Sequence, residues 1–133
     1  MEDMMQIEHL HKSFGEIHAV NDLSFRAKKG ELFAFLGVNG AGKSTTINIL
    51  CGRLAKDAGR VEICGTDMDR DPDLVKRSLG VVFQNSVLDK DLSVRDNLES
   101  RAALYGISGS AFRTRLAELA GMLDFEDLLR RPV

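Results

Sequence analysis

The stretch LGVNGAGKSTTINIL, residues 36–50, limits what this chain can fold into more than any other part of the sequence. In it, Gly37 is followed after four residues by Gly42, Lys43 and Ser44, which is the complete pattern of a phosphate-binding loop. An apolar run precedes the loop, and residues with helical spacing follow it. Because strand, glycine-rich turn and helix are the context in which this pattern binds phosphate, we expect a nucleotide site here and not a plain glycine turn.

The residue types in the loop suit a polyphosphate. Its many negatively charged oxygens need converging hydrogen-bond donors, which only backbone without Cβ atoms can bring close. Gly40 and Gly42 permit this approach, and the N-terminus of the helix near Lys43 adds partial positive charge. Lys43 is expected to reach the outer phosphates, the Ser44 hydroxyl to ligate Mg²⁺ and Thr45 to contact the inner phosphate. The predicted phosphate-binding residues are Asn39, Gly40, Ala41, Gly42, Lys43, Ser44 and Thr45.

Short runs of apolar residues predict the strands of a sheet. Five runs have strand character: residues 6–11, 23–27, 32–36, 59–64 and 79–83. Two of them, 32–36 and 79–83, are continuously apolar, which is typical of strands covered on both faces. Residues 12–22 are expected to form a loop between the first two strands, and residues 28–30 a turn. The core of the molecule is therefore expected to begin at residue 32.

Helix signals follow the loop and dominate the last third of the chain. Residues 43–51 carry apolar positions at helical spacing. Asp71 and Pro72 are suited to open a short helix, because proline is tolerated in a first turn. Ser93 can cap a longer helix that runs to about Tyr105. A final helix is predicted from one apolar face, which consists of Phe112, Leu116, Leu119 and Leu123.

Composition excludes several classes of protein. A chain of 133 residues has room for at most one domain, and its formal net charge of -2 comes from intermixed acidic and basic residues, which argues against a nucleic-acid partner. No apolar run approaches the ~20 residues needed to cross a bilayer, and the first residues lack the features of a secretion signal. Cys51 and Cys64 match no zinc spacing, and we expect both to be buried in a protein of a reducing compartment.

The sequence contains KSFGEIHAV, LGVNGAGKSTT and LGVVFQNSVLDKDLSVRDNL, in this order. Together these three stretches resemble the N-terminal part of an ABC transporter ATP-binding subunit. In KSFGEIHAV, Phe14 stands where the family has an aromatic residue that stacks on adenine. LGVNGAGKSTT is the phosphate loop, and in LGVVFQNSVLDKDLSVRDNL the strand-end Gln84 matches the family's Q-loop glutamine. The intervening GRVEICGTDM also fits, and the wording of residues 81–107 is most similar to the subgroup that serves drug, polysaccharide, lipid and nodulation-factor exporters.

This resemblance implies ATP and Mg²⁺ as ligands and assigns roles to further residues. Phe14 would stack on adenine, and Val20 would belong to the nucleotide site. Lys43 and Gln84 would act in catalysis, with the Gln84 amide ordering Mg²⁺ and the attacking water, so that Ser44 and Gln84 are the expected metal contacts. Without the resemblance, Phe14 would be an ordinary core or loop aromatic, and Gln84 an ordinary polar residue at the end of a strand.

The chain also departs from the family. The sequence contains no Ser-Gly-Gly signature, no apolar strand ending in adjacent Asp and Glu, and no histidine after the phosphate loop. The nearest imitation, AGMLDFED, has Asp124 and Glu126 separated by one residue and overlaps a predicted helix. Because hydrolysis requires a group that orients the attacking water, we expect this chain alone to bind ATP without hydrolysing it, whereas full-length relatives hydrolyse it.

These features together predict an α/β fold: a truncated P-loop NTPase fold with an antiparallel β edge and the beginning of an α-helical subdomain. Residues 1–133 would form a partial nucleotide-binding domain, with strands, P-loop and Q-loop core in residues 1–84 and the start of the helical subdomain in residues 85–133. An incomplete sheet would leave residues 32–36 and 79–83 without neighbours, so we expect poor solubility of the chain alone.

The predicted function is ATP binding, as part of an ABC transporter ATPase subunit that powers export. The implied partners are a transmembrane permease and a second ATP-binding subunit, in a homodimer or heterodimer, which would place the chain in the cytoplasm at the inner face of the cell membrane. Two alternatives remain open. One is another P-loop enzyme, such as a small-molecule kinase, and the other is a truncated, non-catalytic nucleotide-binding or interaction module.

Overall fold

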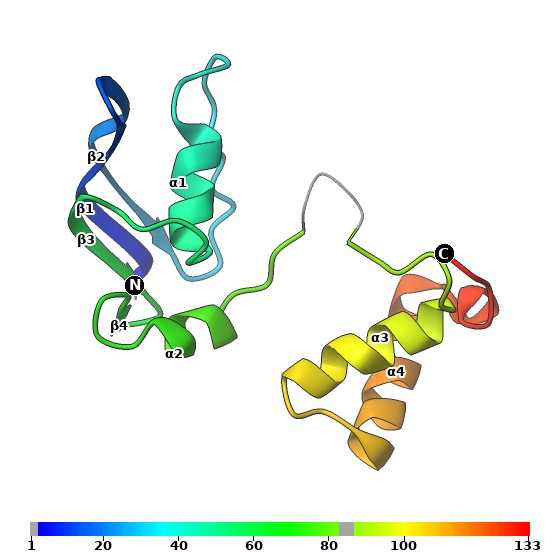
Figure 1. Ribbon diagram of the computed structural model, residues 1–133. Coiled ribbons are helices and arrows are strands. Elements are labelled where there is room, and N and C mark those ends of the chain that lie inside the picture. The colour runs from blue at the N-terminus through cyan, green and yellow to red at the C-terminus, as the bar shows by residue number, and fades with distance from the viewer. Residues whose placement is uncertain (1–2, 83–86) are drawn as a thin grey trace. The chain divides into compact units, whose positions relative to one another are not determined.

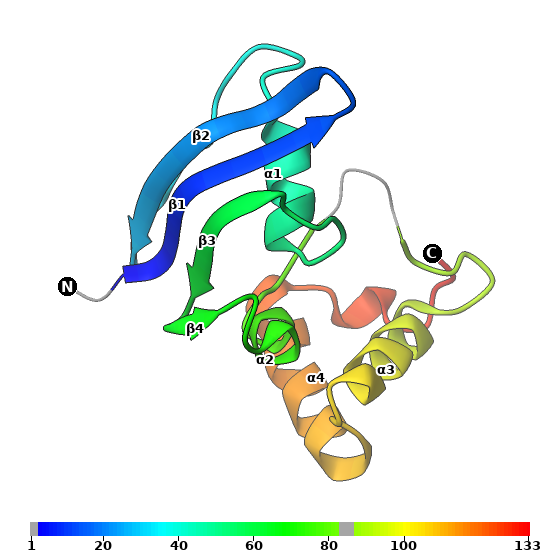
Figure 2. The same cartoon turned by 60° about the vertical axis from the view of Figure 1, so that its left-hand side comes forward.

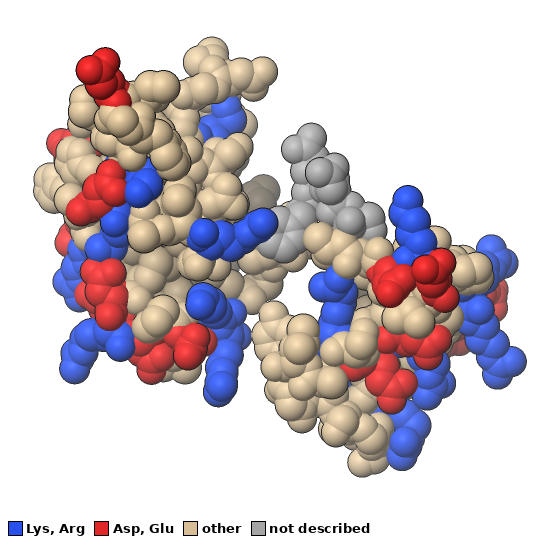
Figure 3. Space-filling model, viewed as in Figure 1, with Lys and Arg blue, Asp and Glu red and all other residues tan. Residues whose placement is uncertain are grey.

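The computed structural model describes residues 3–82 and 87–133. The chain divides into two compact units, Met1–Val81 and Val82–Val133 (Figure 1). The boundary predicted between residues 84 and 85 lies outside the described residues and stays a prediction. Acidic and basic side chains are interspersed on the face of each unit that Figure 3 shows, in keeping with the mixed charge along the sequence.

The first unit contains one antiparallel sheet. Its strands are β1 (Asp3–Phe14), β2 (Ile17–Lys28), β3 (Ala58–Ile63) and β4 (Thr66–Asp67). They lie in the order β2-β1-β3-β4, and every neighbouring pair is antiparallel (Figure 2). The strands predicted at residues 6–11, 23–27 and 59–64, and the antiparallel character of this part of the sheet, are therefore confirmed.

The loop predicted at residues 12–22 is wrong. β1 and β2 continue almost to the end of a tight hairpin, where Phe14 pairs with Ile17. Gly15 lies in the left-handed region at φ 60°, which lets the chain reverse within two residues. The polar residues of this stretch thus belong to the end of the β1–β2 hairpin. The alternation of apolar residues alone did not indicate that the two strands continue this far.

The buried strand predicted at residues 32–36 is also wrong. Residues 31–38 have no regular structure, and Leu32 and Leu36 are 98% and 88% exposed. A strand that is apolar on both faces needs hydrogen-bonded neighbours and cover, and no described segment pairs with this one. Instead, the Phe33 ring stacks on Phe25 of β2 at 4.9 Å between centroids. The described part of the predicted strand 79–83 is likewise irregular, with Val82 fully exposed.

Two helices belong with the sheet. Helix α1 (Lys43–Leu50) and the short helix α2 (Pro72–Arg77) begin where the sequence predicts them, and the Asp71 carboxylate caps α2 by accepting the Leu74 N–H at 3.0 Å. Ile49 of α1 and Val75 of α2 are buried against the sheet. The core cluster consists of Ile7, Leu10, Val20, Ile49, Leu50, Val61, Ile63 and Val75. The packing of these side chains fixes β1, β3 and α1 relative to one another.

A close approach of two strands depends on Gly59. This residue lies in β3 at φ 94°, and a Cβ atom there would be only 2.3 Å from the His9 carbonyl oxygen of β1. His9 itself adopts φ 50° where the pairing of β1 with β2 shifts register between Ile7 and Leu10. The bulge and the glycine therefore fit together, and no larger residue has room at position 59.

The second unit is helical. It contains α3 (Val94–Leu104), α4 (Gly109–Leu123) and the single 3₁₀ turn η1 (Glu126–Leu128). The predicted cap is confirmed, because the Ser93 hydroxyl accepts the Asp96 N–H at 3.1 Å. The predicted face of α4 is partly wrong, since Leu123 is 64% exposed and the buried residues of this helix are Phe112, Leu116 and Ala120. No helix in the described ranges is long and apolar enough to cross a membrane.

The two cysteines differ in environment. Both are free thiols; Cys51 is partly buried at the end of α1, whereas Cys64 is exposed after β3 at φ 51°. The prediction that both are buried is therefore wrong for Cys64. The reason is its place in the turn between β3 and β4, where the chain leaves the core.

We expect the 133-residue chain to self-associate at micromolar concentrations, because Leu32, Leu36 and Val82 are almost fully exposed. Sedimentation velocity would show species larger than a monomer. Replacing Leu32 and Leu36 together by lysine should shift the distribution towards monomer, whereas Ile17→Lys, at another exposed apolar residue, should change it less. A clean monomer of the unmodified chain with a sharp melting transition would contradict this expectation.

Candidate nucleotide-binding site

The glycine-rich loop ends at the N-terminus of α1 with its donors free. Gly42 is the N-cap residue at φ 78°, and the first turn of α1 carries no acidic side chain. Within the residues that the structure describes, the backbone N–H groups of Lys43, Ser44 and Thr45 have no acceptor. Unpaired N–H groups and the helix dipole favour an anion at such a position. The structure therefore provides the donor end that the sequence pattern predicts.

Strand β2 passes close beside this loop. A Cβ atom on Gly42 would lie 2.1 Å from the Ala19 carbonyl oxygen and 3.3 Å from the Val20 Cγ2 atom. Glycine at this position is thus required by both its φ angle and its neighbour. Val20, which the resemblance places in the nucleotide site, is buried beside Gly42 as part of the core, and its contact with a nucleotide stays a prediction.

The Lys43 ammonium lies on the loop's own carbonyl groups. Its Nζ donates hydrogen bonds to the Gly37 oxygen at 2.5 Å and the Val38 oxygen at 2.7 Å. A lysine ammonium has three donors, so one remains for another acceptor. The side chain therefore sits where a phosphate oxygen added to the loop would find a positive charge already in place.

A pocket brings the predicted adenine-stacking residue together with the phosphate loop. It has a volume of about 360 Å³ and is lined by Phe14, Ser44, Thr45, Asn48, Arg53 and Leu54. The Phe14 ring is half exposed, so its face is available to a planar ligand. Ser44 and Thr45 open α1, whereas Phe14 ends β1 thirty residues earlier. The fold thus joins two stretches that the sequence pattern singled out separately.

The pocket also contains residues that the sequence interpretation missed. Asn48 lies one helical turn after Ser44 and Thr45, so its position on the same face of α1 was predictable from helix geometry. Arg53 and Leu54 follow the end of α1, and no motif indicated them. The remaining predicted phosphate contacts, Asn39, Gly40 and Ala41, lie exposed in the loop, and Gln84 lies outside the described residues.

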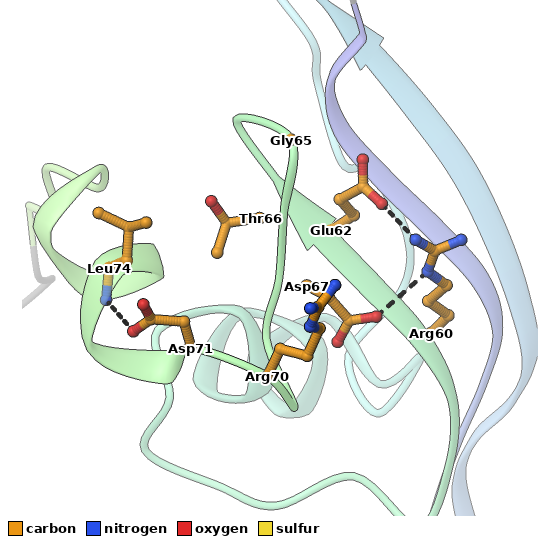
Figure 4. Close-up of a pocket in the computed structure, with 8 residues that line it drawn as sticks. All are labelled: Arg60, Glu62, Gly65, Thr66, Asp67, Arg70, Asp71 and Leu74. Carbon is orange, nitrogen blue, oxygen red and sulfur yellow. Dashed lines mark hydrogen bonds and ion pairs between the residues drawn. The ribbon is translucent and has the colours of Figure 1, made fainter.

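A larger pocket of about 500 Å³ lies at the β4 edge of the sheet (Figure 4). Three of its charged side chains form ion pairs: Arg60 donates to Glu62 at 2.6 Å and to Asp67 at 3.2 Å. The N–H of Asp69, followed by Arg60, lowers the pKa of the Asp67 carboxyl. This pocket shares no lining residue with the Phe14 pocket and contains none of the predicted site residues.

Comparison with known proteins identifies the family. Residues 20–133 match the model of the family described as ABC transporter. The chain belongs to the ABC transporter family. It is 35% identical over 94% of its length to the Nod factor export ATP-binding protein I of Ralstonia nicotianae, covering 38% of that protein. It is 37% identical over its whole length to the ribose import ATP-binding protein RbsA of Hahella chejuensis, covering 28% of it.

Solved ABC transporter proteins share the fold. The structure of cbiO1 from Clostridium perfringens, part of the ABC transporter complex cbiONQ, superposes with a TM-score of 0.86 and 25% identity. That match covers 99% of this chain and 55% of cbiO1. The chain therefore has a mixed α/β fold that corresponds to about half of an ABC ATPase. It spans well under half the length of the curated ABC transporter relatives named above.

Low pH should destabilise the first unit through its paired carboxylates. The Lys12 ammonium, and next the Ser13 N–H, lower the pKa of Asp57 below its usual value of 3.8, and Gln6 does the same for Glu8. Because the unfolded chain then binds protons at higher pH than the folded one, this stability is present above the usual values and is lost as pH falls below them. The urea concentration at the midpoint of unfolding should fall between pH 7 and pH 3. It should fall less steeply in Asp57→Asn than in the unmodified chain. Equal slopes in the two proteins would contradict this assignment.

Proposed function

We propose that this chain binds ATP through the glycine-rich loop and the Phe14 pocket, as the N-terminal part of an ABC transporter ATPase subunit that powers export. The phosphates would contact the free N–H groups at the start of α1 and the Lys43 ammonium. Thr45 would contact the inner phosphate. Adenine would stack on the exposed face of Phe14.

One observation carries the proposal: a single pocket is lined by Phe14 and by Ser44 and Thr45. A pocket for phosphate alone would need only the loop and the helix N-terminus. An aromatic ring in the same pocket lining adds a surface for a base, because stacking requires only the ring face. This combination favours a nucleotide over a simple phosphate ester.

Mg²⁺ would be held by the hydroxyl of Ser44, which lines the Phe14 pocket. The second contact that the resemblance implies is Gln84. When bound, the ion would neutralise charge on the outer phosphates. Ser44 lies in the first turn of α1, beside the N–H groups that have no acceptor. A hydroxyl oxygen at this position suits a hard cation such as Mg²⁺. We propose ATP hydrolysis as the activity of the whole protein and ATP binding as the activity of residues 1–133.

The proposed partners are a transmembrane permease and a second ATP-binding subunit, which would hold the protein at the inner face of the cell membrane. The Nod factor export relative supports export, and the similarly close RbsA relative is named for ribose import. Transport by the whole protein, assayed with its permease in sealed vesicles, distinguishes the two directions. Uptake into the cytoplasmic side would overturn the proposed export.

Isothermal titration calorimetry of residues 1–133 with ATP and with tripolyphosphate, both with Mg²⁺, tests the binding function. We expect both probes to bind at one site and ATP to bind more tightly, because only ATP has a base for Phe14. Absence of binding by both probes would overturn the proposal. Transfer of phosphate to an added small-molecule acceptor would instead support the kinase alternative, which the family match over residues 20–133 disfavours.

A further inference from the structure

The strand end that carries Phe14 is held by one carboxylate. Asp57 precedes β3, and its Oδ1 accepts a hydrogen bond from the Lys12 ammonium at 2.7 Å. Its Oδ2 accepts the Ser13 N–H at 2.7 Å, and its own N–H donates to the His11 carbonyl oxygen at 2.9 Å. One residue thus contacts three successive residues of β1 directly before Phe14. Both carboxylate oxygens are used, so the carboxylate has little freedom to rotate.

Lys12 connects this carboxylate to the aromatic ring. Its side chain is only 13% exposed, and its Nζ lies over the Phe14 ring, 5.5 Å from the centroid. A cation over one face of an aromatic ring is attracted by the ring electrons, and it leaves the other face available. Because Asp57 fixes the ammonium and the ammonium contacts the ring, the orientation of Phe14 depends on both residues.

The segment that contains Asp57 also contributes residues to the lining of the pocket. Residues 51–57 connect the end of α1 with β3, and Arg53 and Leu54 in this segment line the pocket with Phe14, Ser44 and Thr45. The same short connection therefore touches the pocket directly and holds the strand end that carries its ring. A displacement of Asp57 would move both.

We propose that Asp57 and Lys12 are positioning residues that fix the Phe14 ring for the base of the bound nucleotide. This inference rests on the proposed function, since it concerns the base-binding half of the same site. The nucleotide base stacks on the ring face opposite Lys12. The phosphate-binding half, made by the loop and the N-terminus of α1, does not depend on the pair.

The test compares two probes that share phosphates and differ in the base. In Lys12→Met and Asp57→Asn, the affinity for ATP should fall roughly fivefold to tenfold, a part of what loss of a base–aromatic stack costs. The affinity for tripolyphosphate should stay within about twofold, because the loop is unchanged. Lys12→Arg should restore ATP binding, since a guanidinium can keep both the ion pair and the contact with the ring.

A matched control and a double variant separate positioning from a general loss of stability. Lys56 and Asp69 form another ion pair of 2.7 Å with a lysine equally buried, and neither lines the Phe14 pocket, so Lys56→Met should leave both affinities unchanged. In a Phe14→Ala background, Lys12→Met should have no further effect on ATP affinity.

Three results would overturn the inference. One is equal ATP affinity in wild type and Lys12→Met, and another is an equal loss of ATP and tripolyphosphate affinity, which would mean that the pair acts on the whole site. The third is a further loss of ATP affinity from Lys12→Met when Phe14 is already absent. Failure of the wild-type chain to bind either probe would instead reject the proposed function, and the inference with it.

Discussion

Replacement of Lys43 by alanine should reduce the affinity for MgATP by roughly 10-fold to 150-fold, which corresponds to the ~1.5–3 kcal/mol of a charge-assisted hydrogen bond. The Lys43 ammonium already lies at the loop, where it contacts the Gly37 and Val38 carbonyl oxygens, so its loss also leaves these acceptors without their donor. Tripolyphosphate affinity should fall by a similar factor, because the interaction is with phosphate and not with the base.

Calorimetric titration of the variant and of Lys29→Ala measures this effect. Lys29 is an exposed lysine in the turn after β2, and its removal changes the net charge by the same amount without touching the loop. We expect ATP to bind Lys29→Ala as it binds the unmodified chain. An unchanged dissociation constant in Lys43→Ala would reject the placement of the phosphates at this loop.

Replacement of Gly59 by alanine should remove about 2–5 kcal/mol from the free energy of unfolding, the sum of a left-handed backbone penalty and a steric overlap. The new Cβ atom would lie 2.3 Å from the His9 carbonyl oxygen and 2.7 Å from that of Glu8. Both are backbone atoms of the neighbouring strand and cannot turn away as a side chain would. Part or all of the sheet should therefore separate at lower urea concentration.

Gly65→Ala is the matched control, because Gly65 has a similar φ of 74° and no described atom lies within 4 Å of the place that its Cβ would take. It should lose only the backbone penalty, about 1–2 kcal/mol. Urea unfolding followed by circular dichroism gives both values. Equal losses of unfolding free energy in the two variants would show that β3 does not approach the His9 carbonyl as closely as in the structure.

The local signals of the sequence were sufficient for most elements. Caps and hydrophobic periodicity predicted α1, α2 and α3, because a helix is determined by neighbours within one or two turns. The continuous apolar runs failed at residues 32–36, since a strand exists only with a partner and the described residues provide none. Periodicity identifies a surface that needs cover but does not identify what covers it.

The candidate site was predictable where a motif carries its own geometry. The phosphate loop fixes the order of glycine, lysine and serine, and the structure has the expected turn into α1. Arg53, Leu54 and the contacts of Asp57 depend on the path of the chain between α1 and β3, which no local pattern encodes. The match over residues 20–133 shows that the chain belongs to the ABC transporter family, whereas the role of each residue stays a prediction.

The position of the Lys43 side chain at the loop has a thermodynamic consequence. Because its ammonium is bound to two carbonyl oxygens, the long side chain is held at the loop and its third donor is left for a phosphate oxygen. Little side-chain freedom is then lost on binding, which lowers the entropic cost of holding the phosphates.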